Sequence, residues 1–384
     1  MRLLVVSQDF PPAVGGVQTW TERVARALAR FWEVTVLAPA APGDEAHDAR
    51  MPYPVLRWRT PHTSAFGAIV PLALPWALGR SGARVVLCAQ AATAAGPRLA
   101  AGAGWIDRYY VTAHGRELLW APLGPMQRRW RGAILGGAAA VFAVSRFTAG
   151  VVRGLGVPGG RVVVTPNGVD LDRFRPVDPG PWRRRLGLER RPVVLSAGRL
   201  VRRKGFDTLL RAFATLPGTL SNAALMIAGD GPDRGRLEAL ARGLRLPARF
   251  LGRVPDGDLP ALYSAADLFV LAAREEPGGD VEGFGLVLLE AAACGVPAVA
   301  CRSGGVPDAV DDGVSGLLVP PDDPPALAAA MARVLSDGSL RRWLSCGARA
   351  RAARSGWDAA VEPIARRIAQ DAAPGTARPA RRAA

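Results

Sequence analysis

The sequence is poor in lysine, cysteine and histidine. Of its 49 basic residues a single one is lysine, Lys204, and the remaining 48 are arginine. The four cysteines and three histidines are scattered, without the close pairing that structural zinc sites and disulfide frameworks need. We therefore expect no metal site and no disulfides, and we expect a reducing, cytoplasmic environment.

Long apolar runs are lacking as well. Ala65–Leu78 is the longest candidate, and Pro71 and Pro75 interrupt it. A membrane-spanning helix needs about 20 mostly apolar residues. The first residues, MRLLVVSQD, contain too short an apolar run for the core of a signal peptide. We expect neither a transmembrane segment nor a signal peptide.

Acidic residues are outnumbered by basic ones. The chain has 33 acidic residues, a net charge of +16 and a pI near 11.2. Such a charge suits nucleic acid, an anionic membrane surface or merely an arginine-rich proteome. The arginines are spread along the chain, without zinc-finger spacing or an aromatic RNA-binding signature. We therefore do not expect nucleic acid as a partner.

Short apolar runs alternate with helix-length segments in both halves of the chain. A length of 384 residues suits two domains, and the alternation predicts α/β domains built on parallel sheets. We place the boundary between Arg175 and Trp182, so that residues 1–177 and 178–356 form the two domains. Residues 357–370 are expected to form a last amphipathic helix, and residues 371–384 a disordered basic tail.

In the first domain, glycines follow the first strand. Arg2–Val6 predicts a buried strand, and Thr19 is the predicted start of the next helix. Between them, Gly15 and Gly16 allow backbone to approach an anion at a helix N-terminus, although a plain turn explains them equally. The dinucleotide fingerprint G-x-G-x-x-G is absent, which argues against a nicotinamide enzyme. His114 follows another predicted strand, at the sheet edge where ligands bind.

The solitary lysine lies on a strand-to-helix loop of the second domain. Arg199 and Lys204 on this loop form a cationic clamp suited to a diphosphate. The alternative is a solvated basic loop, and Arg202 and Arg203 fit that description. The loop does not match the Walker sequence G-x-x-x-x-G-K-[ST].

Two carboxylates bracket the turn within Ala266–Ala300. Glu282 lies in a Gly-rich loop and Glu290 in the helix predicted over Leu286–Cys294. The N-terminus of this helix, at Phe284–Leu286, presents unpaired N–H groups to an anion. The pattern suits a site that holds a sugar by its hydroxyls and a diphosphate by backbone. A solvated acidic loop is the alternative.

Aromatic residues and arginines share the segment Glu117–Leu135, which reads ELLWAPLGPMQRRWRGAIL. Such a mixture suits an element lying on an anionic membrane surface. A core-facing helix with an ordinary charged face explains it equally.

Seven motifs resemble, in order along nearly the whole chain, those of the retaining GT-B glycosyltransferases of family 4: DFPPAVGGVQ, AHGRE, PNGVD, SAGRLVRRKG, IAGDGP, FLGRV and EGFGLVLLEAAACGVPAVA. The last contains E-x7-E with GFG between the glutamates. The first motif, with TW after it, and the DVEGFG loop are most similar to GDP-mannose-dependent phosphatidylinositol mannosyltransferases. The resemblance implies two Rossmann-like parallel-sheet domains facing across a cleft, and a C-terminal helix crossing back to the first domain.

The resemblance also implies the roles of individual residues. Gly15 and Gly16 pack against the donor diphosphate, and His114 faces the donor sugar. Arg199 and Lys204 neutralise the leaving group. The remaining positions hold the sugar hydroxyls (Glu282 with the backbone of Gly283, Phe284, Gly285 and Leu286), the ribose (Glu290) and the nucleobase (Arg253 and Val254).

The expected activity is retaining transfer of a hexose, mannose above all, from a nucleotide sugar to a lipid-linked or glycan acceptor. GDP-mannose is the favoured donor and a UDP-sugar with a soluble or polysaccharide-precursor acceptor is the alternative, with no prosthetic group and no metal required. A peripheral position at the inner face of the cell membrane is a further expectation. A glycoside hydrolase using Glu282 and Glu290, or a non-catalytic basic adaptor on the same fold, are the other hypotheses. The oligomeric state is not predicted.

Overall fold

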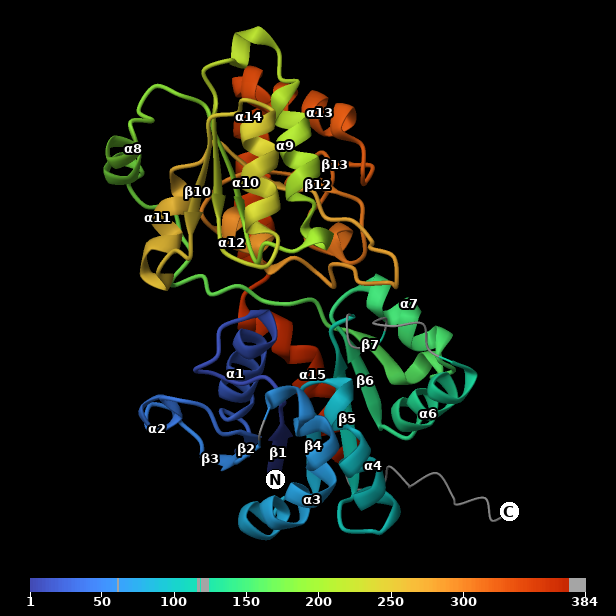
Figure 1. The fold of residues 1–384 in the computed structure, drawn as a ribbon. Coiled ribbons are helices and arrows are strands. Elements are labelled where there is room, and N and C mark those ends of the chain that lie inside the picture. Colours follow the sequence, from blue (N-terminus) through green and yellow to red (C-terminus); the bar gives the residue numbers. More distant parts are fainter. Residues whose placement is uncertain (61, 116–117, 119–123, 373–384) are drawn as a thin grey trace.

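The computed structural model describes residues 1–60, 62–115, 118 and 124–372, which contain two parallel sheets. Each sheet has helices on both faces, and the two domains lie one above the other in Figure 1. The first sheet has seven strands in the order β3-β2-β1-β4-β5-β6-β7, and the second has six in the order β10-β9-β8-β11-β12-β13. The predicted fold of two Rossmann-like parallel-sheet domains is confirmed.

The first sheet is built on short apolar strands. Strand β1 lies inside the sheet and pairs on both sides, with Leu3 opposite Val34 and Val85. Because helices cover both faces, the strands are continuous apolar runs rather than alternating ones. The strands are β1 Arg2–Val6, β2 Glu33–Pro39, β3 Val55–Trp58, β4 Val85–Cys88, β5 Arg108–Ala113, β6 Ala140–Ala143 and β7 Val162–Val164.

Helices cover the two faces of this sheet unequally. One buried cluster joins α3, α4, α6 and α7 to the sheet, and the other joins α1 to it. The helices are α1 Gly16–Leu28, α2 Asp44–Asp48, α3 Phe66–Ser81, α4 Ala95–Gly102, α6 Pro125–Gly136 and α7 Arg146–Gly154, with short 3-10 turns at Thr63–Ala65, Ala91–Thr93 and Gly159–Arg161.

Two expectations about these helices need revision. Helix α1 begins at Gly16, three residues before the predicted Thr19. Gly15 caps it, so the glycine pair itself forms the helix N-terminus and exposes the first N–H groups there. Of the expected interfacial segment Glu117–Leu135, residues 117 and 119–123 lie outside the described residues, and α6 covers the remainder from Pro125.

The second domain repeats the architecture. Its strands are β8 Val193–Ala197, β9 Ala224–Ala228, β10 Ala248–Gly252, β11 Leu268–Leu271, β12 Ala298–Cys301 and β13 Gly316–Val319. Its helices are α8 Gly180–Leu186, α9 Phe206–Ala214, α10 Arg234–Gly243, α11 Leu259–Ser264, α12 Leu286–Ala293, α13 Pro324–Ser336 and α14 Gly338–Ala353. Short 3-10 turns lie at η4 Arg202–Lys204, η5 Gly218–Leu220, η6 Asp256–Asp258 and η7 Val306–Asp308.

The last helix, α15 Trp357–Ala372, leaves the second domain and packs against the first. It lies beside α1 (Figure 1), where Val361, Ile364 and Ile368 are buried in the same cluster as Trp20. Burying these apolar side chains stabilises the crossing by several kcal/mol, at about 1.5–3 kcal/mol for each. The predicted return of the C-terminal helix is confirmed. In the described residues, no helix is both long and apolar enough to cross a membrane.

Candidate functional site

Loops from the two domains meet without room for side chains. A Cβ atom added to Gly283 would lie 1.9 Å from the carbonyl oxygen of His114. A Cβ on Gly16, across the same junction, would come within 3.3 Å of Leu286 Cδ1. The β1 and β5 loops of the first domain therefore contact the loop that precedes α12 in the second. Val144, which follows β6, belongs to the same buried cluster as Phe284 and strengthens this junction.

In the second domain, Lys204 pairs with Glu282 of the Gly-rich loop. Its Nζ is 2.7 Å from Glu282 Oε2, and the two side chains are only 9% and 13% exposed. Burial opposes ionisation of Glu282, but Lys204, Arg203 and a hydrogen bond from the Gly285 backbone outweigh it and hold the pKa of the carboxyl below its usual value. Glu282 is therefore an ionised acceptor in a water-poor setting, with the Lys204 side chain as its nearest basic partner.

Arg203 does not fit the alternative interpretation of a solvated basic loop. Its side chain is 17% exposed and lies 3.4 Å from Asp280 and 3.8 Å from Glu282. It therefore ties the Gly-rich loop to the loop that carries Lys204. Arg202, by contrast, is exposed. The sequence pattern does not predict which of these two adjacent arginines is buried, because their orientation depends on the turn of η4.

Arg199 lies on the same loop as Lys204 and differs from it in every contact. It is exposed, and its guanidinium has no ion pair or hydrogen bond among the described residues. The two members of the predicted clamp are thus unequal. Lys204 is already engaged by a carboxylate, whereas Arg199 is available to an incoming anion.

The N-terminus of α12 follows Gly285, whose φ of 93° is left-handed and favours glycine. No side chain caps this helix end, so its first N–H groups remain to be satisfied by a ligand or water. Phe284 is buried and Leu286 half-buried, which anchors the turn on both sides. The short helix therefore directs its positive end beside Glu282.

Glu290 lies one turn further along, in the middle of α12. Its Oε2 accepts a hydrogen bond of 2.7 Å from the Tyr263 hydroxyl. Burial raises the pKa of Glu290, although Tyr263 and Arg173 act in the opposite direction. After β10, Arg253 is exposed and Val254 is half-buried against the domain core.

His114 is half-buried at the end of β5. Its Nε2 lies 2.9 Å from the carbonyl oxygen of Ala89, and its ring packs edge-on to Trp20 at 5.1 Å. A carbonyl oxygen can only accept, so Nε2 carries the hydrogen in this contact. The ring is thereby fixed in orientation at the junction with Gly283.

Tyr263 and Arg173 were missed by the sequence analysis, as Arg203 was. Each acts on a glutamate far from it in sequence, and neither lies in a recognisable motif. Buried aromatic residues in helices usually serve the core, so Tyr263 carries no signal of its own.

Comparisons with known proteins identify the family of this chain. The model of Glycosyltransferase Family 4 matches residues 14–173, and that of glycosyl transferases group 1 matches residues 180–351. The chain is 38% identical, over 366 residues, to a GDP-mannose-dependent alpha-(1-6)-phosphatidylinositol monomannoside mannosyltransferase of Mycolicibacterium smegmatis, covering 87% of this chain and 89% of that one. The chain belongs to the family 4 glycosyltransferases.

Further relatives of this glycosyltransferase extend the comparison. A GDP-mannose-dependent monoacylated alpha-(1-6)-phosphatidylinositol monomannoside mannosyltransferase of Corynebacterium glutamicum is 32% identical and covers 91% of this chain and 92% of its own. Anabaena HepE in complex with UDP has a TM-score of 0.82 at 21% identity, covering 96% of this chain and 100% of its own, which shows the shared fold. The hydrolase hypothesis is not supported, because both matching models describe transferases.

Proposed function

We propose that this glycosyltransferase moves a mannosyl group from GDP-mannose to a lipid-linked acceptor with retention of configuration. The observation that carries the proposal is the buried Lys204–Glu282 ion pair beside the uncapped N-terminus of α12, where Gly283 and Leu286 lie against His114 and Gly16 of the first domain. The relatives named for GDP-mannose and for phosphatidylinositol mannosides support the choice of donor and acceptor. A UDP-sugar is the alternative donor.

The chemistry requires stabilisation of a leaving group. When the bond between the anomeric carbon and the diphosphate oxygen breaks, the electron pair stays on the nucleotide diphosphate. Arg199, Lys204 and the N–H groups at the start of α12 are the groups assigned to this charge. Fixed donors of this kind stabilise the transition state more than the ground state, because the charge develops only as the bond breaks.

The sugar and nucleotide are assigned to the remaining residues. Glu282 is to accept hydrogen bonds from sugar hydroxyls, and its low pKa keeps it an acceptor. Glu290 is assigned to the ribose, and Arg253 with Val254 to the base. His114 and the glycine pair complete the site from the first domain, so that domain closure excludes water from the reacting bond.

The test is a transfer assay with GDP-mannose and with UDP-glucose, using a phosphatidylinositol mannoside as acceptor. We expect transfer with GDP-mannose and its loss in Lys204→Met. No transfer from any nucleotide sugar by the wild-type protein would contradict the proposal. A chelator control separates metal-dependent from metal-independent activity, and we expect activity to persist in it.

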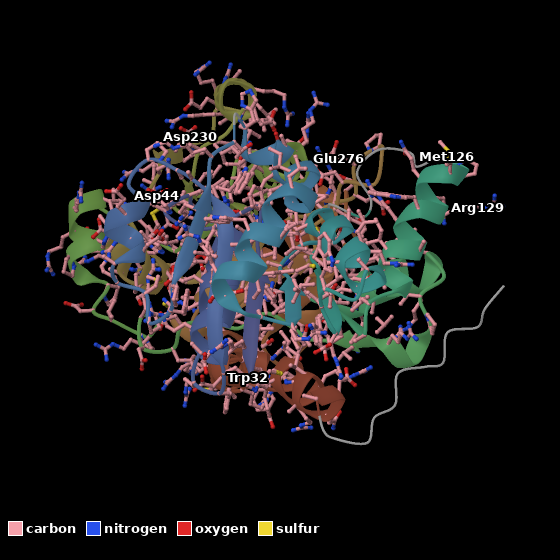
Figure 2. The ribbon with its side chains drawn as sticks, turned by 90° about the horizontal axis from the view of Figure 1, so that it is seen from below. Trp32, Asp44, Met126, Arg129, Asp230 and Glu276 are labelled. Carbon is pink, nitrogen blue, oxygen red and sulfur yellow. The ribbon has the colours of Figure 1, made fainter. Side chains whose placement is uncertain are left out.

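A lipid acceptor calls for access to a membrane surface, and α6 offers one. Met126 and Trp130, four residues apart on one helix face, are 82% and 59% exposed, whereas Ile134 and Leu135 are buried. Figure 2 shows Met126 and Arg129 projecting outward from this helix. Residues 51–165 contain thirteen arginines and only two acidic residues, Asp107 and Glu117. These features favour peripheral contact with anionic lipid.

Vesicle sedimentation tests this contact. We expect the protein to sediment with vesicles containing phosphatidylinositol and to remain in solution with phosphatidylcholine vesicles. The variant Met126→Ser with Trp130→Ser should sediment less while transferring to a short-chain, water-dispersed acceptor as before. Equal sedimentation with both kinds of vesicle, or with neither, would remove the membrane contact from the proposal.

A further inference from the structure

Glu290 is held by a residue to which the proposed function assigns no role. Tyr263, in α11, is 1% exposed and donates its hydroxyl hydrogen to Glu290 Oε2 at 2.7 Å. Among the described residues, the Glu290 side chain makes no other hydrogen bond and no ion pair. One carboxylate oxygen is therefore engaged from within the domain, and the other is left for a ligand.

The Tyr263 ring is itself fixed from two sides. Phe269 of β11 lies against it with ring centroids 5.6 Å apart, and Phe174 packs edge-on at 5.9 Å. Phe174 is 5% exposed and belongs to the segment that links the two sheets. Its neighbour Arg173 stacks over the Phe174 ring and donates to the backbone oxygen of Asp256 at 2.6 Å.

This packing has a consequence for the hydroxyl. Aromatic neighbours on two sides leave a ring that is nearly fully buried little freedom to turn. The Tyr263 hydroxyl is thus a preorganised donor. The contacts of Phe174 with Tyr263, and of Tyr263 with Glu290, connect the segment between the domains to the residue assigned to the ribose.

We propose that Tyr263 is a positioning residue for nucleotide binding, which fixes Glu290 so that its second oxygen accepts the hydroxyls of the nucleotide ribose. The inference rests on the proposed function in one respect, the assignment of Glu290 to the ribose. It adds Tyr263 of α11 to the residues that prepare the nucleotide site. It also gives Phe174, in the segment between the domains, the role of holding the Tyr263 ring.

The surroundings of Glu290 also predict a pH signature. The charged or titratable groups facing it are Tyr263 and Asp256 around α11, Arg173 in the linker, Lys204 in η4, and Cys294 after α12. Burial already raises the pKa of Glu290, and the Tyr263 hydrogen bond opposes that rise. Removing the hydroxyl raises the pKa further. A smaller fraction of Glu290 is then ionised at a given pH, so nucleotide binding weakens most at acidic pH and partly recovers as the pH rises.

The experiment is equilibrium titration of the full chain with GDP and with UDP across a pH series, in wild type and Tyr263→Phe. With the tighter nucleotide we expect Kd to rise about tenfold at neutral pH, the effect of losing a hydrogen bond to a charged group. The midpoint of the pH dependence should move upward. In transfer assays, KM for the donor should rise while kcat at saturating donor stays within about twofold, since bound nucleotide restores the carboxylate geometry.

Tyr109→Phe is the matched control. Tyr109 is equally buried and its hydroxyl also donates to a single oxygen, the carbonyl of Ile134, but it lies in the first domain. This variant reports the cost of losing a buried tyrosine hydroxyl without touching Glu290, and its nucleotide affinity should match wild type. Tm of both variants establishes that each is folded at the assay temperature.

Two further variants keep the inference testable if Tyr263→Phe does not fold. Glu290→Gln removes the titrating charge, so the part of the pH dependence that comes from this carboxyl should disappear. Phe174→Leu loosens the ring from the linker side and should raise Kd severalfold in the same direction. Unchanged affinity and an unchanged pH midpoint in Tyr263→Phe, or in Phe174→Leu where the first is unfolded, overturn the inference while leaving the proposed function intact. Failure of the wild-type chain to bind either nucleotide overturns both.

Discussion

The two domains share an architecture and contribute to the site in opposite ways. The second domain contributes buried polar side chains that are already partnered, as in the ion pair of Lys204 with Glu282 and the hydrogen bond of Tyr263 to Glu290. The first domain contributes the backbone at Gly16 and the oriented imidazole of His114. Most of its arginines lie on the surface. Under the proposed function, this difference means that the second domain holds a preorganised donor site and that the first domain covers it. Four predictions test this division.

The largest effect is expected at Lys204, where the charge of the second domain is concentrated. Lys204→Met should lower kcat/KM by a factor of roughly 10²–10³, or about 2.7–4 kcal/mol, because a preorganised charge stabiliser is lost. Steady-state transfer kinetics measure the effect. The double variant Lys204→Met with Glu282→Gln controls for stability, since it leaves no unpaired carboxylate. Equal rates in wild type and Lys204→Met would end the view that the second domain supplies the leaving-group charge.

The next largest effect concerns the contact between the domains. Gly283→Ala places a methyl group 1.9 Å from the His114 carbonyl oxygen, so the loops must separate. We expect kcat to fall by about 10–100-fold, as for an angstrom-scale misplacement of reacting groups, while nucleotide affinity, a property of the second domain, changes little. Gly218→Ala is the matched control, because nothing lies within 4 Å of its added methyl group. A loss of nucleotide affinity as large as the loss of kcat would contradict the division.

The third prediction concerns stability against acid. The folded-state pKa of Glu282 lies below the usual value for a glutamate, so its pair with Lys204 contributes stability that is present above the unfolded pKa and is lost as pH falls through the folded pKa. Urea unfolding at pH 7 and near pH 4 measures this loss. We expect wild type to lose more stability over this interval than the Lys204→Met, Glu282→Gln double variant. An equal loss in the two proteins would show that the pair does not preorganise the second domain.

The smallest effect is expected at the linker's contact with the first domain. Arg23 and Asp170 form a partly exposed ion pair at 2.6 Å. Arg23→Gln should cost no more than about 1 kcal/mol of unfolding free energy, because pairs near solvent are screened. Nucleotide affinity should stay unchanged, because Asp170 is bound to Arg23 of the first domain and has no assigned contact with the nucleotide. Denaturant unfolding and nucleotide titration check the two parts, and weakened binding would show that the Arg23–Asp170 contact supports the nucleotide site.

Much of the fold follows from local pattern. Apolar runs such as Val193–Ala197 and Leu268–Leu271 are continuous because both faces of a parallel sheet are covered, and that makes them visible in sequence. The start of α1 was less predictable. The sequence predicts a start at Thr19. In the structure the helix begins at Gly16, and Gly15 is its N-cap.

The candidate site was predictable where composition is unusual. A single lysine among 49 basic residues marks a position where an ammonium group is used, and it lies in the site's centre beside Glu282. The residues that hold the site together were not predictable. Arg203 and Tyr263 have ordinary neighbours in sequence, and their partners lie 77 and 27 residues away.

The sequence by itself determined the strands, the alternation of strand and helix, and which short loops carry charge and glycine, because these depend on periodicity and composition within a few residues. Only the tertiary structure decided that Gly283 touches His114, that Arg203 turns inward while Arg202 does not, and that Tyr263 reaches Glu290. Those contacts depend on packing between segments distant in the chain, where one side chain's orientation is chosen by the volume and charge of neighbours that no local pattern specifies.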